Sequence, residues 1–539
     1  MTDLSTITFG STTDPYRKAE ERGWDITNAT ELAAPLELEA DVVIVGTGAG
    51  GGTAAETLSK AGLSVVLLEA GPLKTSSQFD MKERAAYRDL YEEGTGRANK
   101  SGSMTILQGR SVGGSTTVNW TTSFRTPPET LKFWADNMGV TGCSVAELAP
   151  YFKQMETRLN IEKWGMPPNP NNDTLKTASE KLGYSWATIH RNVKGCVNLG
   201  YCGLGCPVDA KQSMLVTTIP TALDYKAKLI HHARVERVLV EGDAVVGVEA
   251  SALTSDGWGT TGKTIKVRAA RTVLAGGGIN TPAVLLRSSV PDPHGRIGKR
   301  TFLHPTTLSM GIYDKAIDPY YGAPQSIYSD HFQWQTVDTG PVNFKLEVPP
   351  LQPAFAAAFY GAGGEMLTDS MDKLINTQCM IALMRDGFDE RSEGGSIELN
   401  DRGEPIVDYE LNAYLLEGVR RAWHTMVEMQ FATGAKTVRP AHKEAQHYRS
   451  WTEAKAAIAG FKCAPHKVTV GSAHVMGGSA MGEDETRSVV NSEGKFHHLA
   501  NLYVMDGSLF PTSIGANPQL SIYGLVLKLS TKLASQFSA

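Results

Sequence analysis

The chain has 539 residues, of which 41% are hydrophobic, and its formal net charge is -5 at pH 7. A chain of this size can bury a large core, and its length predicts two to four domains, most naturally those of an α/β enzyme. Charges of both signs are interspersed, which argues against a nucleic-acid groove or a basic membrane-docking face. Small, neutral substrates fit this composition best.

The N-terminal segment lacks both the basic start and the apolar core of a secretion signal. No run of about eighteen apolar residues occurs, so we predict no transmembrane segment. We expect a soluble, cytoplasmic protein. Residues 1–39 are interpreted as a polar N-terminal extension that leads into the first strand.

Residues 41–71 carry the pattern of a dinucleotide-binding unit. The apolar run Val42–Val45 predicts a buried strand, and a helix is expected to begin near Thr53 and to direct its amides at a pyrophosphate. Three glycines have the GxGxxG spacing that the turn between them needs: Gly46, Gly48 and Gly51. Glu69 closes the second strand, where a ribose hydroxyl would lie. The unit alone fits NAD as well as FAD.

Further elements follow before the middle of the chain. Helix-like sequence at Met81–Glu93 leads into the glycine-rich loop Gln108–Trp120, whose small polar residues suit close approach to a ligand. Leu229–Ala250 predicts a hairpin that turns at Glu241–Asp243, and Arg271–Asn280 predicts a buried strand. Strands typical of a nucleotide domain thus recur after a long intervening segment.

The composition changes after this point. Residues 305–463 are aromatic-rich and punctuated by proline, which suits a sheet that covers a pocket, and we interpret them as a substrate domain. The nucleotide domain would therefore comprise residues 40–304 and, on the return of the chain, residues 464–539. This last segment contains a short strand in LYVMDGS and an amphipathic helix that ends near Ala534.

Candidate catalytic residues lie in the C-terminal segment. His474 stands among small residues in GSAHVMGGSAMG, an environment that suits a general base beside open space. Asn517 follows in IGANPQLS, where Pro518 restrains the backbone and the amide could hydrogen-bond the oxygen of a reacting alcohol. The alternative for His474 is a loop histidine that only satisfies its own hydrogen bonds.

Four separated segments, in this order, resemble the glucose-methanol-choline (GMC) family of flavin oxidoreductases. They are residues 41–71, the loop GRSVGGSTTVN, the segment GGGINTPAVLLRS, and HVMGGSAMG through IGANPQLSIYGL. The resemblance implies an α/β fold, in which a Rossmann-like FAD-binding domain is joined to an α+β substrate domain with an antiparallel sheet. It also implies oxidation of an alcohol by hydride transfer to FAD. Residues 305–463 match in position only, as the family's variable domain.

The resemblance implies roles for single residues as well. His474 takes the place of the catalytic histidine, which would receive the hydroxyl proton while a hydride leaves for flavin N5. Asn517 matches a second position, filled by His or Asn in different members, and would steady the oxygen. The implied FAD contacts are Gly46, Gly48, Ala49, Gly50 and Gly51 at the pyrophosphate, Glu69 at the adenosine ribose, Val235 at the adenine, Arg110, Gly113, Gly114 and Asn119 on the flavin loop, Asp506 near the ribityl chain, and Pro518 beside the ring.

Some positions depart from the family or keep a simpler interpretation. Members that bind FAD covalently through histidine carry it where this chain has Val118, so we expect noncovalent FAD. The patterns HVMGG and RTFLHP differ from the usual ones, so contacts near Val475 and His304 are expected to differ too. Asp506 could instead cap a helix, and Asn119 could merely satisfy a turn.

A glycine-rich loop at residues 195–213 holds three of the six cysteines: Cys196, Cys202 and Cys206. Their spacing resembles the loop of iron-sulfur FAD sugar dehydrogenases, whose thiolates would hold a [3Fe-4S] cluster. Zinc with a distant fourth ligand and a loop without metal are the alternatives. We interpret the other three as small buried hydrophobes: Cys143, Cys379 and Cys463.

The segments GGSTTVNWTTSFRTPPETLKFW and YCGLGCPVDAKQS are most similar to long-chain alcohol oxidases and related bacterial dehydrogenases. A hydrophobic primary or secondary alcohol is therefore the expected substrate, and an aldehyde or ketone the product. The sequence leaves the electron acceptor open among oxygen, a quinone and a cytochrome. Two rival functions are an NAD-dependent dehydrogenase with a structural zinc at the cysteine loop and a non-catalytic electron-transfer flavoprotein.

Overall fold

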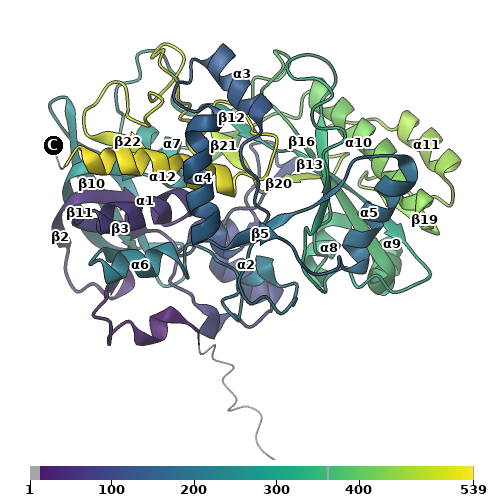
Figure 1. Ribbon diagram of the computed structural model, residues 1–539, viewed down its shortest axis with the longest axis horizontal. Coiled ribbons are helices and arrows are strands. Elements are labelled where there is room, and N and C mark those ends of the chain that lie inside the picture. The colour runs from purple at the N-terminus through teal and green to yellow at the C-terminus, as the bar shows by residue number, and fades with distance from the viewer. Residues whose placement is uncertain (1–12, 361–362, 538–539) are drawn as a thin grey trace, which may run out of the picture.

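The computed structural model describes residues 13–360 and 363–537. Two parts lie side by side in Figure 1: one combines the purple and teal N-terminal half with the yellow C-terminal end, and the other is built mostly from the green middle of the chain. Each part contains a large sheet. The predicted α/β class, with a Rossmann-like part and an antiparallel part, is confirmed.

The first sheet has eight strands. Their order is β1 (Asp25–Asn28), β8 (Lys228–His231), β3 (Val65–Glu69), β2 (Leu36–Val45), β11 (Thr260–Leu274), β10 (Ala244–Leu253) and β9 (Ala233–Glu241), and β22 (Leu502–Val504) also pairs with β11. The pairs from β1 to β11 and the pair β11–β22 are parallel, whereas β11, β10 and β9 are antiparallel. The hairpin expected at Glu241–Asp243 is confirmed.

Several element boundaries differ from those expected. The first strand of the nucleotide unit, β2, begins at Leu36, and β1 already pairs with β8 within the segment interpreted as an extension. The helix after the glycine turn, α1 (Ala49–Lys60), begins at Ala49 and not near Thr53. Gly276 caps α7 (Gly277–Arg287), so the predicted strand Arg271–Asn280 ends at Leu274. Glycine can adopt the backbone conformation needed at the starts of α1 and α7. Because glycine has no side chain, it also lets the backbone lie close to other segments.

Helices cover the parallel strands. α1 packs against α12 (Gln519–Ser535) and α6 (Thr218–Asp224), and α12 packs against α4 (Val145–Arg158). In Figure 1 α12 and α1 run beside each other across the left part, although they come from opposite ends of the chain. The central residues Val42, Val43 and Ile44 are fully buried, as expected for a strand covered on both faces.

The second sheet also has eight strands and is antiparallel except for one pair. Their order is β4 (Met104–Ile106), β20 (Val470–Ser472), β13 (Thr306–Ile312), β16 (Thr377–Met384), β15 (Phe344–Glu347), β14 (Ile327–Ser329) and β6 (Ala187–Thr188), and β19 (Thr437–Pro440) pairs with β13. Three of these strands, β4, β20 and β6, come from outside residues 305–463. The division of the chain at those residues stays a prediction.

Helices pack on this sheet as well. α10 (Ala413–Ala432) and α5 (Pro170–Leu182) contact its strands, and α11 (Trp451–Gly460) packs on α10. α8 (Pro353–Tyr360) and α9 (Gly364–Asp372) contribute to a separate apolar cluster around β13 and β16. β16 is buried along its whole length, so this sheet forms the second core of the molecule.

Smaller elements complete the fold. A four-stranded sheet has the order β18 (Pro405–Asp408), β17 (Gly395–Leu399), β12 (Lys299–Leu303) and β21 (Val475–Gly477), and β5 (Ile161–Lys163) pairs with β7 (His190–Asn192). The remaining helices are α2 (Glu83–Leu90) and α3 (Pro128–Met138). Leu303 of β12 lies opposite Val475 of β21, so the residues that follow and precede these two are brought together, His304 and His474.

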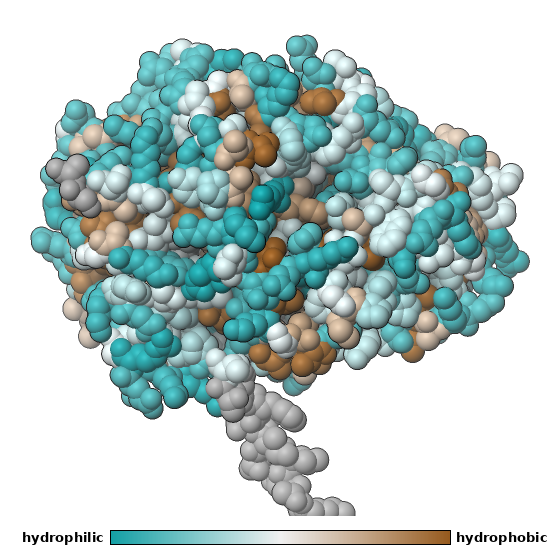
Figure 2. Space-filling view, viewed as in Figure 1, coloured by the Kyte–Doolittle hydropathy of each residue, from teal (hydrophilic) through white to brown (hydrophobic). Residues whose placement is uncertain are grey.

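Polar residues cover most of the face shown in Figure 2, and apolar ones appear singly or in small groups. None of the helices in the described part of the chain combines the length and the apolar character needed to cross a membrane.

The turn between β2 and α1 fits tightly against two distant segments. A Cβ atom added to Gly46, which has φ +96°, would lie 2.5 Å from the carbonyl oxygen of Ala275. A Cβ atom on Gly50 would lie 1.8 Å from the carbonyl oxygen of Met505. Ala275 follows β11 and Met505 follows β22, so the turn lies where three parallel strands end. Only glycine allows this approach.

We therefore predict that Gly50→Ala destabilises the protein. Backbone atoms must shift to admit the methyl group, and overpacking of this kind costs about 1–3 kcal/mol. Denaturant unfolding followed by fluorescence measures the change. Gly165→Ala is the control, because a Cβ atom there meets nothing within 4 Å. Equal stability of the two variants would contradict the assigned packing.

Candidate active site

A cavity of about 750 Å³ is lined by residues of both large sheets. Its volume is typical of sites for organic ligands. Most residues expected from the sequence line it: Gly46, Gly48, Ala49, Gly50, Glu69, Arg110, Gly114, Asn119, Val235, His474, Asp506, Asn517 and Pro518. Gly51 and Gly113 are not among the residues that line the cavity. A Cβ atom on Gly51 would lie 1.9 Å from the carbonyl oxygen of Gly46, and the Gly113 N–H donates to Thr47 Oγ1 at 3.0 Å.

Glu69 joins the glycine turn to the end of β3. Its Oε2 accepts hydrogen bonds from the backbone N–H and the hydroxyl of Thr47 at 3.0 and 2.6 Å, and its Oε1 accepts from the Gly71 N–H at 2.8 Å. Burial raises the pKa of the Glu69 carboxyl, while these bonds and the charge of Arg110 oppose the rise. A carboxylate has about four acceptor positions, so one is left for a ligand hydroxyl.

Arg110 lies at the same end of the cavity as Glu69. Its Nη2 donates to the carbonyl oxygens of Ala70 at 3.3 Å and Gly257 at 2.9 Å. The resemblance placed Arg110 on the flavin loop, whereas these bonds attach it to the residue that follows Glu69. The expected contact of Arg110 with the flavin stays a prediction.

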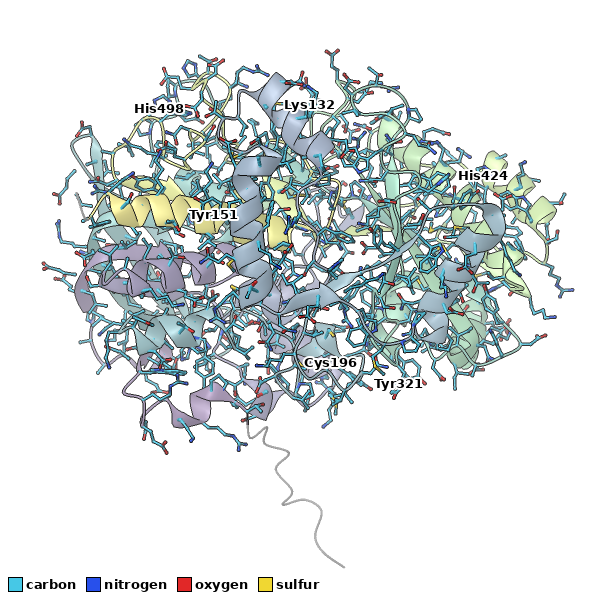
Figure 3. The ribbon with its side chains drawn as sticks, in the orientation of Figure 1. Lys132, Tyr151, Cys196, Tyr321, His424 and His498 are labelled. Atoms are coloured by element: carbon cyan, nitrogen blue, oxygen red, sulfur yellow. The ribbon has the colours of Figure 1, made fainter. Side chains whose placement is uncertain are left out.

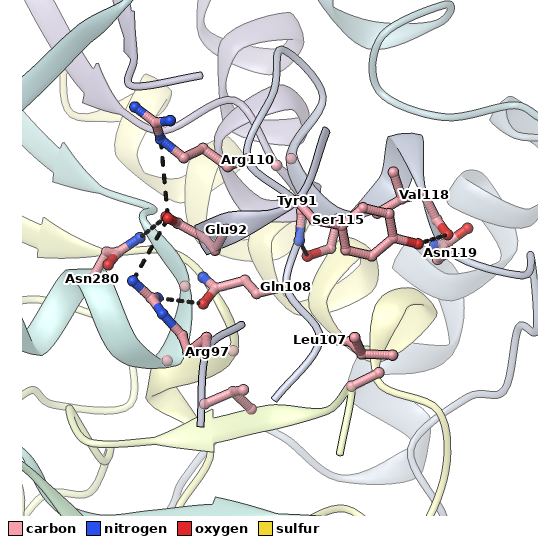
Figure 4. Close-up of a pocket in the computed structure, with 18 of the residues that line it drawn as sticks. Tyr91, Glu92, Arg97, Leu107, Gln108, Arg110, Ser115, Val118, Asn119 and Asn280 are labelled. Atoms are coloured by element: carbon pink, nitrogen blue, oxygen red, sulfur yellow. Dashed lines mark hydrogen bonds and ion pairs between the residues drawn. The ribbon is translucent and has the colours of Figure 1, made fainter. Parts of the chain in front are cut away.

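A cluster of polar side chains near Arg110 was not identified from the sequence. Figure 4 shows Glu92 between Arg110, Arg97 and Asn280. Glu92 Oε1 accepts from Asn280 Nδ2 at 3.3 Å, and Glu92 Oε2 lies 3.6 Å from Arg97 Nη2 and 4.0 Å from Arg110 Nε. Arg97 also donates to Gln108 Oε1 at 2.9 Å. No local spacing marks these residues, because they meet only through the fold.

Asp506 connects the end of β22 with the start of α7. Its Oδ2 accepts from the Gly277 N–H at 2.8 Å and the Thr281 hydroxyl at 2.6 Å, and its Oδ1 accepts from the Ser508 N–H at 2.7 Å. It thus caps the short helix Gly507–Leu509, as in the simpler interpretation, and also lines the cavity. Burial raises the pKa of its carboxyl.

Asn119 is similarly engaged by the protein. Its Nδ2 donates to Gln519 Oε1 at 2.7 Å, and its Oδ1 accepts from the Thr121 N–H at 3.2 Å. The adjacent Val118 also lines the cavity and carries no nucleophile. The glycine-rich loop is therefore tied to the start of α12.

His474 forms a pair with His304. Their Nδ1 atoms lie 3.0 Å apart, and the Gly515 N–H donates to His304 Nε2 at 3.2 Å. A neutral imidazole has one N–H, so at this contact one ring donates and the other accepts. Since Nδ1 of His474 faces His304, Nε2 is the ring nitrogen left for a ligand. The altered RTFLHP segment therefore supplies a partner for the histidine.

Burial and the nearby charge of Lys345 lower the pKa of His474 to about 4. Burial, His474 and Lys345 also lower the pKa of His304 well below its usual value. Lys345 Nζ itself lies over the rings of Phe124 and Tyr328, 3.1 and 4.2 Å from their centroids. Both histidines are therefore neutral near pH 7.

The orientation of Asn517 is set by Glu347. Asn517 Nδ2 and Gln325 Nε2 both donate to Glu347 Oε2, at 3.2 and 2.6 Å. Asn517 Oδ1 is buried and has no hydrogen-bond partner in the described part of the chain. The sequence led us to expect an amide that steadies a substrate oxygen. In the structure the amide NH₂ group faces Glu347, so Asn517 offers its oxygen as an acceptor.

An apolar wall closes the cavity on the side of the second sheet. It is formed by Leu308, Leu351, Phe355, Phe359, Cys379, Ile381 and Leu383. Such a wall suits a hydrocarbon chain. Cys379 and Cys143 are buried as expected, whereas Cys463 is only partly buried.

The cysteine loop lies outside this wall and near the surface; Figure 3 labels Cys196 at the lower side of the molecule. Buried Lys211 ties it to the glycine-rich loop by donating to the carbonyl oxygens of Cys202 at 2.7 Å and Asn119 at 3.1 Å. Burial raises the pKa of the Cys196 and Cys206 thiols. Across the described residues no three or more His, Cys, Asp or Glu side chains are grouped to hold a metal ion, so neither the expected cluster nor zinc gains support.

Known proteins are similar to this chain in sequence over most of its length. An uncharacterized GMC-type oxidoreductase of Mycobacterium tuberculosis (strain ATCC 25618 / H37Rv) is 29% identical over 516 residues, which cover 95% of this chain and 78% of that protein. The long-chain-alcohol oxidase FAO4B of Arabidopsis thaliana is 28% identical over 520 residues, covering 92% and 67%.

Solved structures share the fold at low identity. Formate oxidase of Aspergillus oryzae RIB40 superposes with a TM-score of 0.67 at 15% identity and covers 94% of this chain and 99% of that one. Pyridoxine 4-oxidase from Mesorbium loti gives a TM-score of 0.63 at 18% identity, covering 91% and 98%.

Family descriptions match most of the chain. Residues 41–79 match an FAD binding domain, and residues 87–306 and 390–525 match GMC oxidoreductase. The flavin match favours FAD over the NAD of the rival function. The glycine turn, the free acceptor position on Glu69, and a cavity lined by His474, Asn517 and apolar side chains fit this assignment. The chain belongs to the GMC family of FAD-dependent oxidoreductases.

Proposed function

We propose that the protein oxidises a hydrophobic primary or secondary alcohol to an aldehyde or ketone. The observation that carries this proposal is that one cavity is lined by an apolar wall and by two polar groups: His474, with Nε2 left for a ligand, and Asn517, with an Oδ1 that has no partner among the described residues. A hydroxyl both donates and accepts hydrogen bonds, so it matches such a pair. The similarity to long-chain-alcohol oxidases supports the hydrophobic substrate.

FAD would be held noncovalently by the residues around the cavity. The β2–α1 turn and the N-terminus of α1 would take the pyrophosphate, and Glu69 would take the adenosine ribose. Asp506 and Pro518 also line the cavity. When bound, FAD supplies the hydride acceptor. Val118 gives no route to a covalent bond.

The protein's own part in the reaction is to bind the hydroxyl and manage its proton. The hydroxyl of the bound alcohol would donate its hydrogen bond to Asn517 Oδ1 or His474 Nε2, and a bare Nε2 of His474 would take the proton as the alcohol is oxidised. The apolar wall would keep the carbon chain in place and exclude water. A fixed approach of the reacting carbon lowers much of the barrier.

We predict that His474→Ala retains FAD and loses most of its activity. Loss of a positioned proton-transfer group costs about 10²–10⁴-fold in rate. Anaerobic stopped-flow reduction of the flavin by a long-chain primary alcohol measures this step. His190→Ala is the control, because His190 is exposed on β7. A His474 variant that reduces flavin at a near-normal rate would remove the proposed role.

We also predict that the rate of flavin reduction resists acid more than an ordinary histidine would allow. The pKa of His474 is lowered to about 4, so the neutral ring persists as the pH falls from 7 to about 5. The rate of flavin reduction should therefore stay nearly constant over this range and fall only as the pH approaches 4. An ordinary histidine with a pKa of about 6.5 would lose activity near pH 6.5. A limb centred there contradicts the assigned environment.

The iron-sulfur cluster remains a prediction of the cysteine spacing alone. Iron and acid-labile sulfide analysis of the purified protein, together with its visible spectrum, tests it. Two flavin bands without a broad added absorption, and no iron, would leave Cys196, Cys202 and Cys206 as structural thiols. A cluster would favour an electron-carrying partner over oxygen as the acceptor.

A further inference from the structure

Trp258 has the largest exposed fraction, 68%, among the exposed large apolar side chains of the described residues. It also lines the cavity of the candidate active site. Tryptophan is highly buried on average in folded proteins. An exposed indole at a ligand cavity therefore has a large apolar surface that a bound ligand can cover.

The backbone around Trp258 is held by hydrogen bonds within the turn between β10 and β11. The Thr254 N–H donates to the carbonyl oxygen of Gly259 at 2.9 Å, and the Gly259 N–H donates to Thr254 Oγ1 at 3.0 Å. The Trp258 N–H donates to Asp256 Oδ1 at 3.0 Å. These bonds fix the backbone that carries the indole, so little ordering of the chain is needed when a ligand covers it.

Strand register places this turn beside the start of β9. Ala252 of β10 lies opposite Ala233, the first residue of β9, so the turn extends past the end of that strand. Ala233 and Val235 line the cavity, and the family resemblance assigns Val235 to the adenine of FAD. Three residues of the turn line the same cavity: Asp256, Gly257 and Trp258. The turn therefore lies at the end of the cavity where the adenine is expected.

Arg110 connects the turn to the strand end that carries Glu69. Its Nη2 donates to the carbonyl oxygens of Gly257 at 2.9 Å and Ala70 at 3.3 Å. A Cβ atom added to Gly257, which has φ +75°, would lie 2.5 Å from Arg110 Nη1, so the guanidinium packs directly on the turn. Ala70 follows Glu69, the residue expected at the adenosine ribose. Trp258, next to Gly257, is therefore held near the expected ribose site.

We propose that Trp258 is a binding residue for the adenine of FAD and that its indole covers one face of the base. This inference rests on the proposed function, which places the adenosine ribose at Glu69. The base is bonded directly to that ribose, so it lies next to the Glu69 end of the cavity, where the turn is held. Every nucleobase has a flat face that stacks on an aromatic ring. Stacking also removes exposed apolar surface of Trp258 from water.

The contact involves the adenosine part of the cofactor and not the flavin part. ADP contains the adenine, its ribose and the pyrophosphate but no flavin. ADP alone should therefore meet Trp258 in the FAD-free protein. This consequence distinguishes the proposal from a contact between Trp258 and the flavin.

Fluorine NMR of the full chain, labelled with 5-fluorotryptophan, tests the contact directly. The chain has nine tryptophans, and comparison with Trp258→Phe assigns the signal of Trp258. In the FAD-free protein this signal should show the solvent isotope shift between H₂O and D₂O that an exposed ring gives. FAD and ADP should both displace the signal and reduce that isotope shift. A signal that FAD leaves unchanged, or that ADP leaves unchanged at concentrations that displace FAD, would overturn the proposal.

The affinity for FAD gives a second test. Base–aromatic stacking predicts that Trp258→Ala raises the dissociation constant of FAD about 5- to 100-fold, measured by calorimetric titration of the FAD-free protein. Trp258→Phe keeps a flat ring and should raise the constant less. Tyr321→Ala is the control, because Tyr321 is 58% exposed and is not among the residues that line the cavity. An unchanged constant in Trp258→Ala, or equal losses of affinity in the Ala and Phe variants, would contradict stacking on the base.

These outcomes are separate from those of the proposed function. Neither the fluorine signal nor the affinity for FAD involves turnover of an alcohol. If ADP moves the Trp258 signal while no alcohol reduces the flavin, the proposed oxidation fails and the adenine contact stands. If an alcohol bleaches the flavin while the Trp258 signal ignores FAD and ADP, the oxidation stands and the adenine contact fails.

Discussion

The close approach of three backbone segments at the β2–α1 turn is the constraint on which the rest of the structure depends. Gly46 lies against Ala275 and Gly50 against Met505, so the carboxyl ends of β2, β11 and β22 are held together. Since β22 comes from the last part of the chain, this packing returns the C-terminal segment to the cofactor side. The proposed catalytic residues His474 and Asn517 lie on the same segment.

Pairing between strands then brings the side chains of the candidate site together. β21 pairs with β12, which brings His474 to His304, and β20 pairs with β13 of the second sheet. The C-terminal segment thus contributes strands to both the four-stranded sheet and the second eight-stranded sheet. Asn517, on the way to α12, meets Glu347 at the end of β15. One cavity therefore receives its polar groups from the return segment and its apolar wall from the middle of the chain.

The sequence predicted those parts of the fold and the site that depend on short-range contacts along the chain. The buried run Val42–Val45, the glycine turn and Glu69 are readable because each follows from a short-range requirement of the strand–turn–helix unit. The start of α1 was expected too late, since consecutive glycines look unlike a helix. The sequence did not identify three residues of the site: His304, Glu347 and Glu92. Their positions depend on sheet register and on contacts with side chains far away in sequence. The amide direction of Asn517 was missed for the same reason.

We propose that this GMC oxidoreductase uses FAD to oxidise a hydrophobic alcohol. The most direct measurement is the visible spectrum of the purified protein before and after anaerobic addition of a long-chain primary alcohol. We expect two flavin bands that are bleached by the alcohol, and a flavin that is released when the protein is denatured. A protein without flavin, or a flavin that no alcohol of any chain length bleaches, would contradict it.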